Sequence, residues 1–251
     1  MLIRPQLLSS VFLPGMQGVL HVGAHKAEER ADYIEVGWNR IIWVEAQSSL
    51  AEALRTQIDC DSEMVFHCAA WGKSNLELTL NIASNSQSTS LFDFEMHSHY
   101  YPEVVASGAE KVLTRRLDEL VPEDFPLDFI NLDIQGAELE ALKGLGHLLE
   151  KVQAVYVEVN RELLYAGIPM VSDIDRFLER WGFARAVTVW THAGWGDALF
   201  LKRNGQISRE CRIQIGQLIF FVADRVQRAK RILKKSMTQI YRKFGRRGAH
   251  R

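Results

Sequence analysis

Short apolar runs recur along residues 1–205, and each run is bounded by turn residues. Five of them are rich in β-branched and aromatic side chains and have the length of strands. These runs cover residues 18–24, 40–46, 64–70, 127–134 and 152–159. Continuous apolar runs of this length are typical of parallel strands that are buried on both faces.

Helical patterns separate these runs. Residues 27–37 form one such pattern, which closes on Gly37, and residues 48–58 form another, which begins with capping serines. Residues 136–151 form a third, with leucines at helical spacing at positions 139, 142, 145 and 149. Strands that alternate with helices of this size predict βαβ units and a parallel sheet.

The end of this region has a different pattern. The segments 183–191 and 196–203 flank a turn and predict a closing antiparallel hairpin. Trp195, in the turn, either borders a binding site or packs the hairpin. Residues 72–126 interrupt the alternation with polar strands and a serine-rich loop. The expected fold is therefore an α/β sandwich with a mostly parallel sheet and an antiparallel last strand.

Composition narrows the class of protein. The chain has 251 residues, 47% of them hydrophobic and 24% charged, as in ordinary globular proteins. Its three cysteines, Cys60, Cys68 and Cys211, form no CxxC pair, which argues against a disulfide framework or a zinc site and favours a reducing cytoplasm. We find no signal peptide and no apolar run of membrane-spanning length.

The net charge of −1 conceals a strong asymmetry. Residues 206–251 contain 13 lysines and arginines but two acidic residues, whereas residues 1–205 have a net charge of −12. Apolar residues in this tail follow a helical stripe at positions 215, 219, 222, 226, 229, 233, 237, 240 and 244. We predict a body (1–205) and a basic amphipathic helix (206–251) that contacts an anionic membrane surface or, as the second choice, self-associates. A nucleic-acid partner is disfavoured, because it needs no apolar stripe.

A glycine turn follows the first strand in the stretch VLHVGAHKAEE. Gly23 lies between this strand and a helical pattern, so the turn offers backbone N–H groups to a ligand. His21 stands where an acid is common, and Ala27 stands where a glycine is common. The turn alone therefore predicts either a cofactor site or a tight βα connection.

Glu45 strengthens the cofactor interpretation. It ends the second apolar run, 22 residues after Gly23. An acid at about this distance accepts hydrogen bonds from ribose hydroxyls in nucleotide-binding folds. The alternative is a surface glutamate at the end of a strand.

Further polar residues follow the later strands. Asp133 comes directly after an apolar run, with Gln135 close behind it, and Glu158 and Asn160 end the next strand. Such groups meet at the carboxyl edge of a parallel sheet, where they can position or deprotonate a hydroxyl. Glu138, at the start of a helix, is expected to complement the helix dipole.

The loop at residues 81–104 is the least core-like part of the body. It is a solvated excursion or, as a unit, a lid or binding loop whose hydroxyl, amide and aromatic groups suit a carbohydrate. His97, His99 and Asp133 are the candidates for a general base. No metal site is assigned, because the His-x-His pair has no convincing third ligand, and a cation between Asp133 and Glu158 is the weaker interpretation.

Four segments in order carry a family resemblance. VLHVGAHKAEE with IIWVEA, then TRRLDEL, then DFINLDIQGAELEALKG, and then VYVEVN resemble the FkbM-type methyltransferases across residues 15–203. The resemblance implies a seven-stranded Rossmann-like (class I) methyltransferase fold, S-adenosylmethionine as cofactor, and O-methylation of a hydroxyl on a sugar, glycan or related secondary metabolite.

The resemblance also implies roles for particular residues. The turn at Gly23, Ala24 and His25 would hold the methionine part of the cofactor. Glu45, with Ala46 beside it, would hold the ribose. Cys68 and Ala69 would flank the adenine, whereas Asp133 and Gln135 would face the methyl group and the acceptor. The cofactor-binding positions that the resemblance implies are therefore 23, 24, 25, 45, 46, 68, 69, 133 and 135.

The sequence therefore predicts a cytoplasmic S-adenosylmethionine-dependent O-methyltransferase, which the tail could bring to the inner face of the membrane. Two other classes are open. A nicotinamide-dependent oxidoreductase would share the glycine turn and the acid, but it usually has a fuller glycine fingerprint. A non-catalytic Rossmann-like binding or scaffold protein would keep the fold without the cofactor, and His21 is the residue that favours it.

Overall fold

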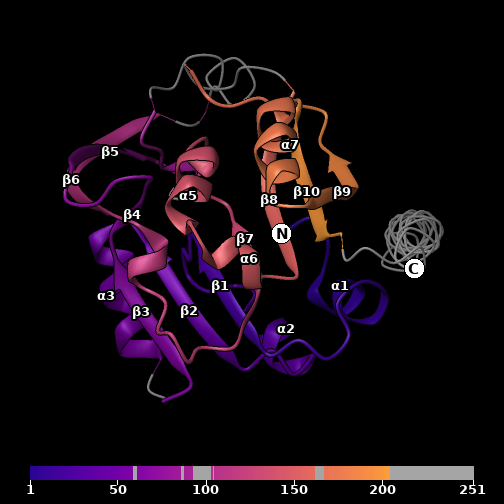
Figure 1. Cartoon of the computed structure of the whole chain (residues 1–251). Coiled ribbons are helices and arrows are strands. Elements are labelled where there is room, and N and C mark those ends of the chain that lie inside the picture. Colours follow the sequence, from indigo (N-terminus) through magenta and orange to yellow (C-terminus); the bar gives the residue numbers. More distant parts are fainter. Residues whose placement is uncertain (59–60, 86–87, 93–102, 104, 162–166, 204–251) are drawn as a thin grey trace, which may run out of the picture. The chain divides into compact units, whose positions relative to one another are not determined.

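The computed structural model of the chain describes residues 1–58, 61–85, 88–92, 103, 105–161 and 167–203 (Figure 1). These residues belong to one compact unit, Met1–Gln206. The tail at 206–251 lies outside the described residues, so its helix and the boundary of the body stay predictions.

A seven-stranded sheet forms the centre of this unit. Along the sheet the strands are ordered β3 (Glu63–His67), β2 (Arg40–Glu45), β1 (Gly18–Val22), β7 (Leu127–Leu132), β8 (Ala154–Asn160), β10 (Trp195–Lys202) and β9 (Phe183–Trp190). The first five run parallel, and β10 lies antiparallel to both β8 and β9. The expected mostly parallel, Rossmann-like fold with an antiparallel last strand is therefore confirmed.

Helices cover both faces of the sheet, as strands without polar alternation require. On one face α5 (Glu138–Leu145), α6 (Leu148–Lys151) and α7 (Val171–Arg180) form the main core with leucine, isoleucine and valine side chains of β1, β2, β7 and β8. The opposite face is covered by α1 (Pro5–Val11) and α2 (Arg30–Glu35), and α3 (Ser48–Gln57) packs beside β2 and β3. In the described part of the chain, no helix has the length and apolar content needed to cross a bilayer.

The interruption between residues 72 and 126 is a second, small sheet. The long strands β5 (Glu77–Ala83) and β6 (Ala106–Arg115) pair antiparallel, and β4 (Ala69–Ala70) joins β6 in parallel. A single turn of 3-10 helix, Leu117–Glu119, leads back to the main sheet. Figure 1 shows this sheet beside the carboxyl ends of β2 and β3.

Three details of the helices differ from the sequence expectation. The helix expected at residues 27–37 is α2, and it begins at Arg30 instead of residue 27, because His25 and Ala27 adopt left-handed backbone angles (φ +47° and +54°) in the turn. Residues 136–151 form two helices, since the chain turns at Gly146 (φ +49°). The prediction of a serine cap was wrong for α3: the Glu110 carboxylate accepts hydrogen bonds from both N–H and Oγ of Ser48.

Strand register arranges polar side chains in two levels at the carboxyl edge. His21 is level with Trp43 on one side and with Asn131 on the other, and Asn131 is level with Tyr156. Side chains two positions apart share a face of a strand. The next positions on the same face are 23, 45, 133 and 158, and position 197 pairs with 158, so the candidate residues form one row above the first.

Candidate active site

A cavity of about 580 Å³ opens along this upper row. It is lined by the ends of β1, β2, β7 and β8, by the start of β10 and by the segment 88–91. Of the sequence-predicted residues, the cavity brings together Gly23, His25, Glu45, Ala46, Cys68, Ala69, Asp133 and Gln135. Ala24 is buried in the turn between two of them. His97 and His99 lie outside the described residues, so their role stays a prediction.

The glycine turn needs a glycine at its first position. Gly23 has φ +85°, and a Cβ built on it would lie 1.9 Å from the carbonyl oxygen of Asp133. The N–H groups of Gly23 and Ala24 both donate to the carbonyl of Val44, which holds the turn against β2. The turn is therefore wedged between two neighbouring strands, with its open side toward the cavity.

Glu45 ties the turn to the end of β2. Its Oε2 accepts a hydrogen bond from the backbone N–H of His25 (2.7 Å), and its Oε1 accepts one from the N–H of Gln47 (2.8 Å). The residue is 8% exposed and lines the cavity. Burial raises the pKa of this carboxyl, and the two backbone donors oppose that shift. Glu45 therefore presents a fixed acceptor group beside the turn.

An apolar wall stands next to Glu45. It consists of Ala46, Leu50, Cys68, Ala69, Ala70 and Leu80. The N–H of Cys68 donates to the carbonyl of Glu45, so the wall and the carboxylate share one rigid support. Burial raises the pKa of the Cys68 thiol to about 12, which leaves it as an unreactive apolar surface.

Two carboxyl groups face the other half of the cavity and share one donor. The Nε2 of Gln135 donates to Oδ1 of Asp133 and to Oε2 of Glu158, both at 3.1 Å. Within the described part of the chain, Oδ2 of Asp133 and Oε1 of Glu158 have no hydrogen-bond partner. Gln135 itself has φ +53°, a left-handed conformation that costs a non-glycine residue on the order of 1 kcal/mol. The local backbone is thus held in a strained form that places an amide between two acids.

The loop that carries this bridge is held from below by Glu138. Its carboxyl accepts hydrogen bonds from the N–H groups of Ile134 and Gly136. Burial raises the pKa of Glu138 to about 7. Glu138 lies in the first turn of α5, as a complement to the helix dipole requires, but it mainly fixes the loop before the helix.

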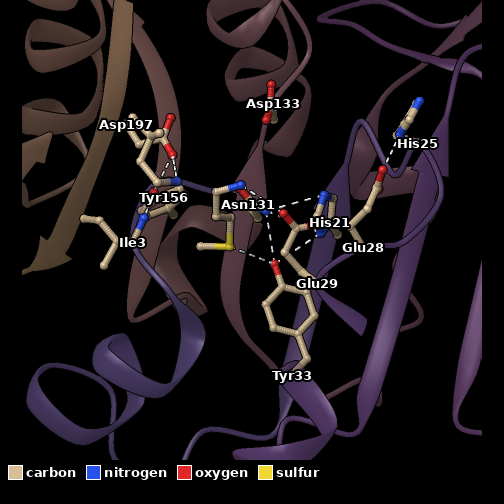
Figure 2. A network of polar contacts seen from close by, with 12 residues as sticks. Ile3, His21, His25, Glu28, Glu29, Tyr33, Asn131, Asp133, Tyr156 and Asp197 are labelled. Atoms are coloured by element: carbon tan, nitrogen blue, oxygen red, sulfur yellow. Dashed lines mark hydrogen bonds and ion pairs between the residues drawn. The ribbon is translucent and has the colours of Figure 1, made fainter. Parts of the chain in front are cut away.

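Four acids that line the cavity were not singled out by the sequence analysis: Glu28, Glu29, Glu103 and Asp197. Asp197 accepts hydrogen bonds from the Tyr156 hydroxyl and from the N–H of Leu2, and the N–H of Ile3 donates to the Tyr156 hydroxyl (Figure 2). Burial raises the pKa of Asp197. The signal was present in the sequence as one acid directly before the apolar run ALFL of β10, but its partners, Tyr156 and Leu2, could be found only from the structure.

His21 belongs to the lower level of the edge. Its Nδ1 lies 3.1 Å from the Tyr33 hydroxyl, and Nδ2 of Asn131 donates to that hydroxyl at 3.0 Å (Figure 2). The imidazole also packs on Trp43, with 5.0 Å between ring centroids. Burial lowers the pKa of His21, so the imidazole is neutral at neutral pH. His21 is therefore a satisfied buried residue at the floor of the cavity.

The loop beyond β5 closes one side of the cavity. Ser88, Thr89, Ser90 and Leu91 line it, and the Ser90 hydroxyl donates to the carbonyl of Gln135 (2.7 Å). Trp195 lines it from the start of β10, so its side chain borders the site.

These residues fit the parts of S-adenosylmethionine. The turn at Gly23 lines the cavity with backbone, the Glu45 carboxylate can accept hydrogen bonds from ribose hydroxyls, and the apolar wall suits the face of an adenine ring. With the strand order β3-β2-β1-β7-β8-β10-β9, the site defines a Rossmann-like methyltransferase.

Comparison with known proteins gives the family. The profile of the methyltransferase FkbM domain family matches residues 21–184, more than half of the chain, so the chain belongs to this family. Its cofactor is S-adenosylmethionine. The class of nicotinamide-dependent oxidoreductases is thereby set aside. No curated protein matches the chain significantly.

Solved structures with a similar fold are distant in sequence. They include a protein of the NADB-Rossmann superfamily from Streptococcus agalactiae, with 12% identity over 94% of this chain and 85% of that one and a TM-score of 0.47. A TehB-like SAM-dependent methyltransferase from Corynebacterium glutamicum has 10% identity over 79% and 86%, with a TM-score of 0.43. A SAM-dependent methyltransferase from Aquifex aeolicus has 12% identity over 79% and 89%, with a TM-score of 0.41.

Proposed function

We propose that this methyltransferase acts on oxygen and that its acceptor is a hydroxyl of a neutral sugar, glycan or related polyol. The observation that carries the proposal is the pair of carboxyl groups, Asp133 and Glu158, that Gln135 bridges. Oδ2 of Asp133 and Oε1 of Glu158 can each accept a hydrogen bond from a ligand in the cavity, and a hydroxyl group is a suitable donor to either oxygen.

The lining of the cavity also supports a neutral acceptor. The described residues that line it include seven carboxyl side chains but neither lysine nor arginine. Phosphate and carboxylate groups are normally held by such cations. Trp195 and the hydroxyls of Ser88 and Thr89 offer the stacking surface and hydrogen-bonding groups that suit a sugar ring.

We divide the cavity residues into a group that would hold the cofactor and a group that would face the acceptor. We assign the turn at residues 23–25 to the methionine part, Glu45 with Ala46 to the ribose, and the wall with Cys68 and Ala69 to the adenine. S-adenosylmethionine supplies an electrophilic methyl group on a sulfonium. Asp133 and Gln135 face the remaining half of the cavity, where the acceptor would lie.

Asp133 is the residue we assign as general base. Burial, together with repulsion by Asp197, raises the pKa of its carboxyl, which makes it a stronger proton acceptor. Burial and repulsion by Asp133 raise the pKa of Glu158 as well, and the second oxygen of this carboxyl can orient the acceptor. Asp133 would accept the hydroxyl proton on Oδ2, while the bound cofactor would supply the methyl group to the acceptor oxygen and keep the electron pair of the broken C–S bond on its sulfur.

The test is methyl transfer from labelled S-adenosylmethionine to a panel of neutral glycosides and the matching uronic acids. We expect transfer to oxygen of the neutral members, and a loss of about 10²- to 10⁴-fold in kcat for Asp133→Asn. Glu158→Gln should keep most of the rate, since the amide keeps an oxygen that can orient the acceptor. Transfer to nitrogen or to the uronic acids alone, or full activity of Asp133→Asn, would contradict the proposal. Full activity of Asp133→Asn would direct the search for the base to His97 and His99.

The cellular setting is a further proposal from the sequence. Cysteine usage favours the cytoplasm, and the basic tail favours contact with an anionic membrane surface over self-association. Such contact would place the body near lipid-linked glycans.

A further inference from the structure

The half of the cavity that faces the acceptor concentrates negative groups without a compensating side chain. Asp133 and Glu158 are bridged through one amide, and Asp197 pairs with Glu158 across neighbouring strands. Burial is the main cause of the raised pKa values of all three carboxyls, and repulsion among them adds to the shifts of Asp133 and Glu158.

The charged groups around this half come from every neighbouring element. The amino group of Met1 is paired with Glu29 at 2.9 Å and also lowers the pKa values of Asp133 and Asp197, and the His21 imidazole below is neutral. Glu138 lies behind the loop and adds a further acid. The lining residues that the structure describes contain no lysine or arginine. A positively charged ligand would therefore relieve a repulsion that a neutral ligand leaves in place.

The two forms of the cofactor differ by that charge. S-adenosylmethionine carries a positive sulfonium, and methyl transfer leaves the neutral thioether S-adenosylhomocysteine. We infer that the carboxyl groups of Asp133 and Glu158 make the cavity select the donor over its product by charge, so that S-adenosylmethionine binds more tightly than S-adenosylhomocysteine. The inference rests on the cofactor site proposed above, and it predicts weak product inhibition.

The magnitude follows from Coulomb's law in a partly buried site. One net negative charge several ångströms from the sulfonium favours the cation by about tenfold or more in affinity. Because the groups lie in a cavity, salt screens this preference less than it would screen a surface pair.

Calorimetric titration of the full chain tests the inference without any acceptor. The ligands are S-adenosylmethionine, S-adenosylhomocysteine and the analogue in which a protonated amine on carbon replaces the sulfonium. We expect the two cations to bind about tenfold more tightly than the thioether. The amine analogue separates the effect of the charge from the effect of the methyl group, because it carries a positive charge as the donor does but lacks the transferable methyl group.

Two isosteric variants assign the effect to residues. Asp133→Asn and Glu158→Gln keep an oxygen that accepts from Gln135, and each should narrow the ratio of the two dissociation constants by about threefold or more, mainly through weaker binding of the cations. Glu52→Gln is the matched control, because that side chain is 75% exposed and lies outside the cavity. It should leave the ratio unchanged.

The outcomes distinguish a failure of this inference from a failure of the proposed cofactor site. If the thioether binds as tightly as the donor in the wild-type protein, the inference is wrong and the cofactor site stands. If the cations bind more tightly but neither isosteric variant narrows the ratio, the assignment to Asp133 and Glu158 is overturned. If none of the three ligands binds, the proposed cofactor site itself fails.

Discussion

Glu138 makes the stability of this protein depend on pH in a way that can be worked out from the structure. Its buried carboxyl has a pKa of about 7 in the folded chain, against 4.5 for an exposed glutamate. Because the folded value is the higher one, the stabilisation of the protonated form is complete below about pH 4.5. It is lost as the pH rises through about 7.

The size of the effect follows from the difference between the two pKa values. Each pKa unit corresponds to about 1.4 kcal/mol, so the carboxyl costs the folded state about 3 kcal/mol once the pH is well above 7. In Glu138→Gln the side-chain oxygen still accepts hydrogen bonds from Ile134 and Gly136, but no proton is lost. The free energy of unfolding of the variant should therefore fall less than that of the wild type between pH 5 and pH 9.

Urea denaturation at several pH values measures this difference directly. Asp133, Glu158 and Asp197 also have raised pKa values and contribute to the slope of both proteins. Because Glu138 adds to the shift of Glu158, the difference between the two curves measures Glu138 together with this repulsion. Ala141→Gly, in the same helix, is the control, because it removes no titratable group and should lower both ends of the curve by about 1 kcal/mol. Parallel curves for the wild type and Glu138→Gln would refute the reasoning.

Three further predictions concern the turn, the hydroxyl pair and the tail. Gly23→Ala should destabilise the fold by at least about 2 kcal/mol in urea denaturation, whereas Gly37→Ala, with φ +86° and open space around it, should cost about 1 kcal/mol and leave S-adenosylhomocysteine binding intact. Tyr156→Phe removes a donor to Asp197 and the acceptor of the Ile3 N–H, so stability should fall by about 1–2 kcal/mol and exchange at the Ile3 amide should accelerate. Flotation with anionic liposomes should be lost on deletion of residues 206–251, and unchanged flotation would rule out the membrane contact.

The sequence was sufficient to predict the strands of the main sheet and several of the residues that line the cavity at their carboxyl ends. An apolar run that ends in one polar residue marks the carboxyl edge of a parallel strand, and this signal located both Glu45 and Asp133. The glycine turn at position 23 was also recognised, because a glycine stands between an apolar run and a helical pattern. The structure explains why glycine is needed there: φ is positive, and the carbonyl of Asp133 lies too close for a side chain. Such features are local in sequence, so they need no knowledge of strand order.

Features that depend on register could not be predicted in the same way. Asp197 becomes a cavity residue because β10 inserts antiparallel beside β8 and pairs position 197 with 158. The hydrogen bonds of Tyr156 to Asp197 and Ile3 join segments that lie about 40 and 150 residues apart in the chain. The replacement of a serine cap by Glu110 on α3 likewise comes from a strand 62 residues away.

The two levels of polar residues explain why His21 does not disable the cofactor site. The lower level contains neutral groups, the imidazole of His21, the amide of Asn131 and the hydroxyl of Tyr33, which satisfy one another where water is excluded. The acids at the strand ends, Glu45, Asp133 and Glu158, lie in the upper level, where the cavity can hold a ligand. An acid at position 21 would add a charge beneath Asp133 and raise its pKa further, whereas the neutral imidazole leaves Asp133 free to respond to the cation above it. His21 therefore leaves unchanged the charges on which the proposed selection of the sulfonium would depend.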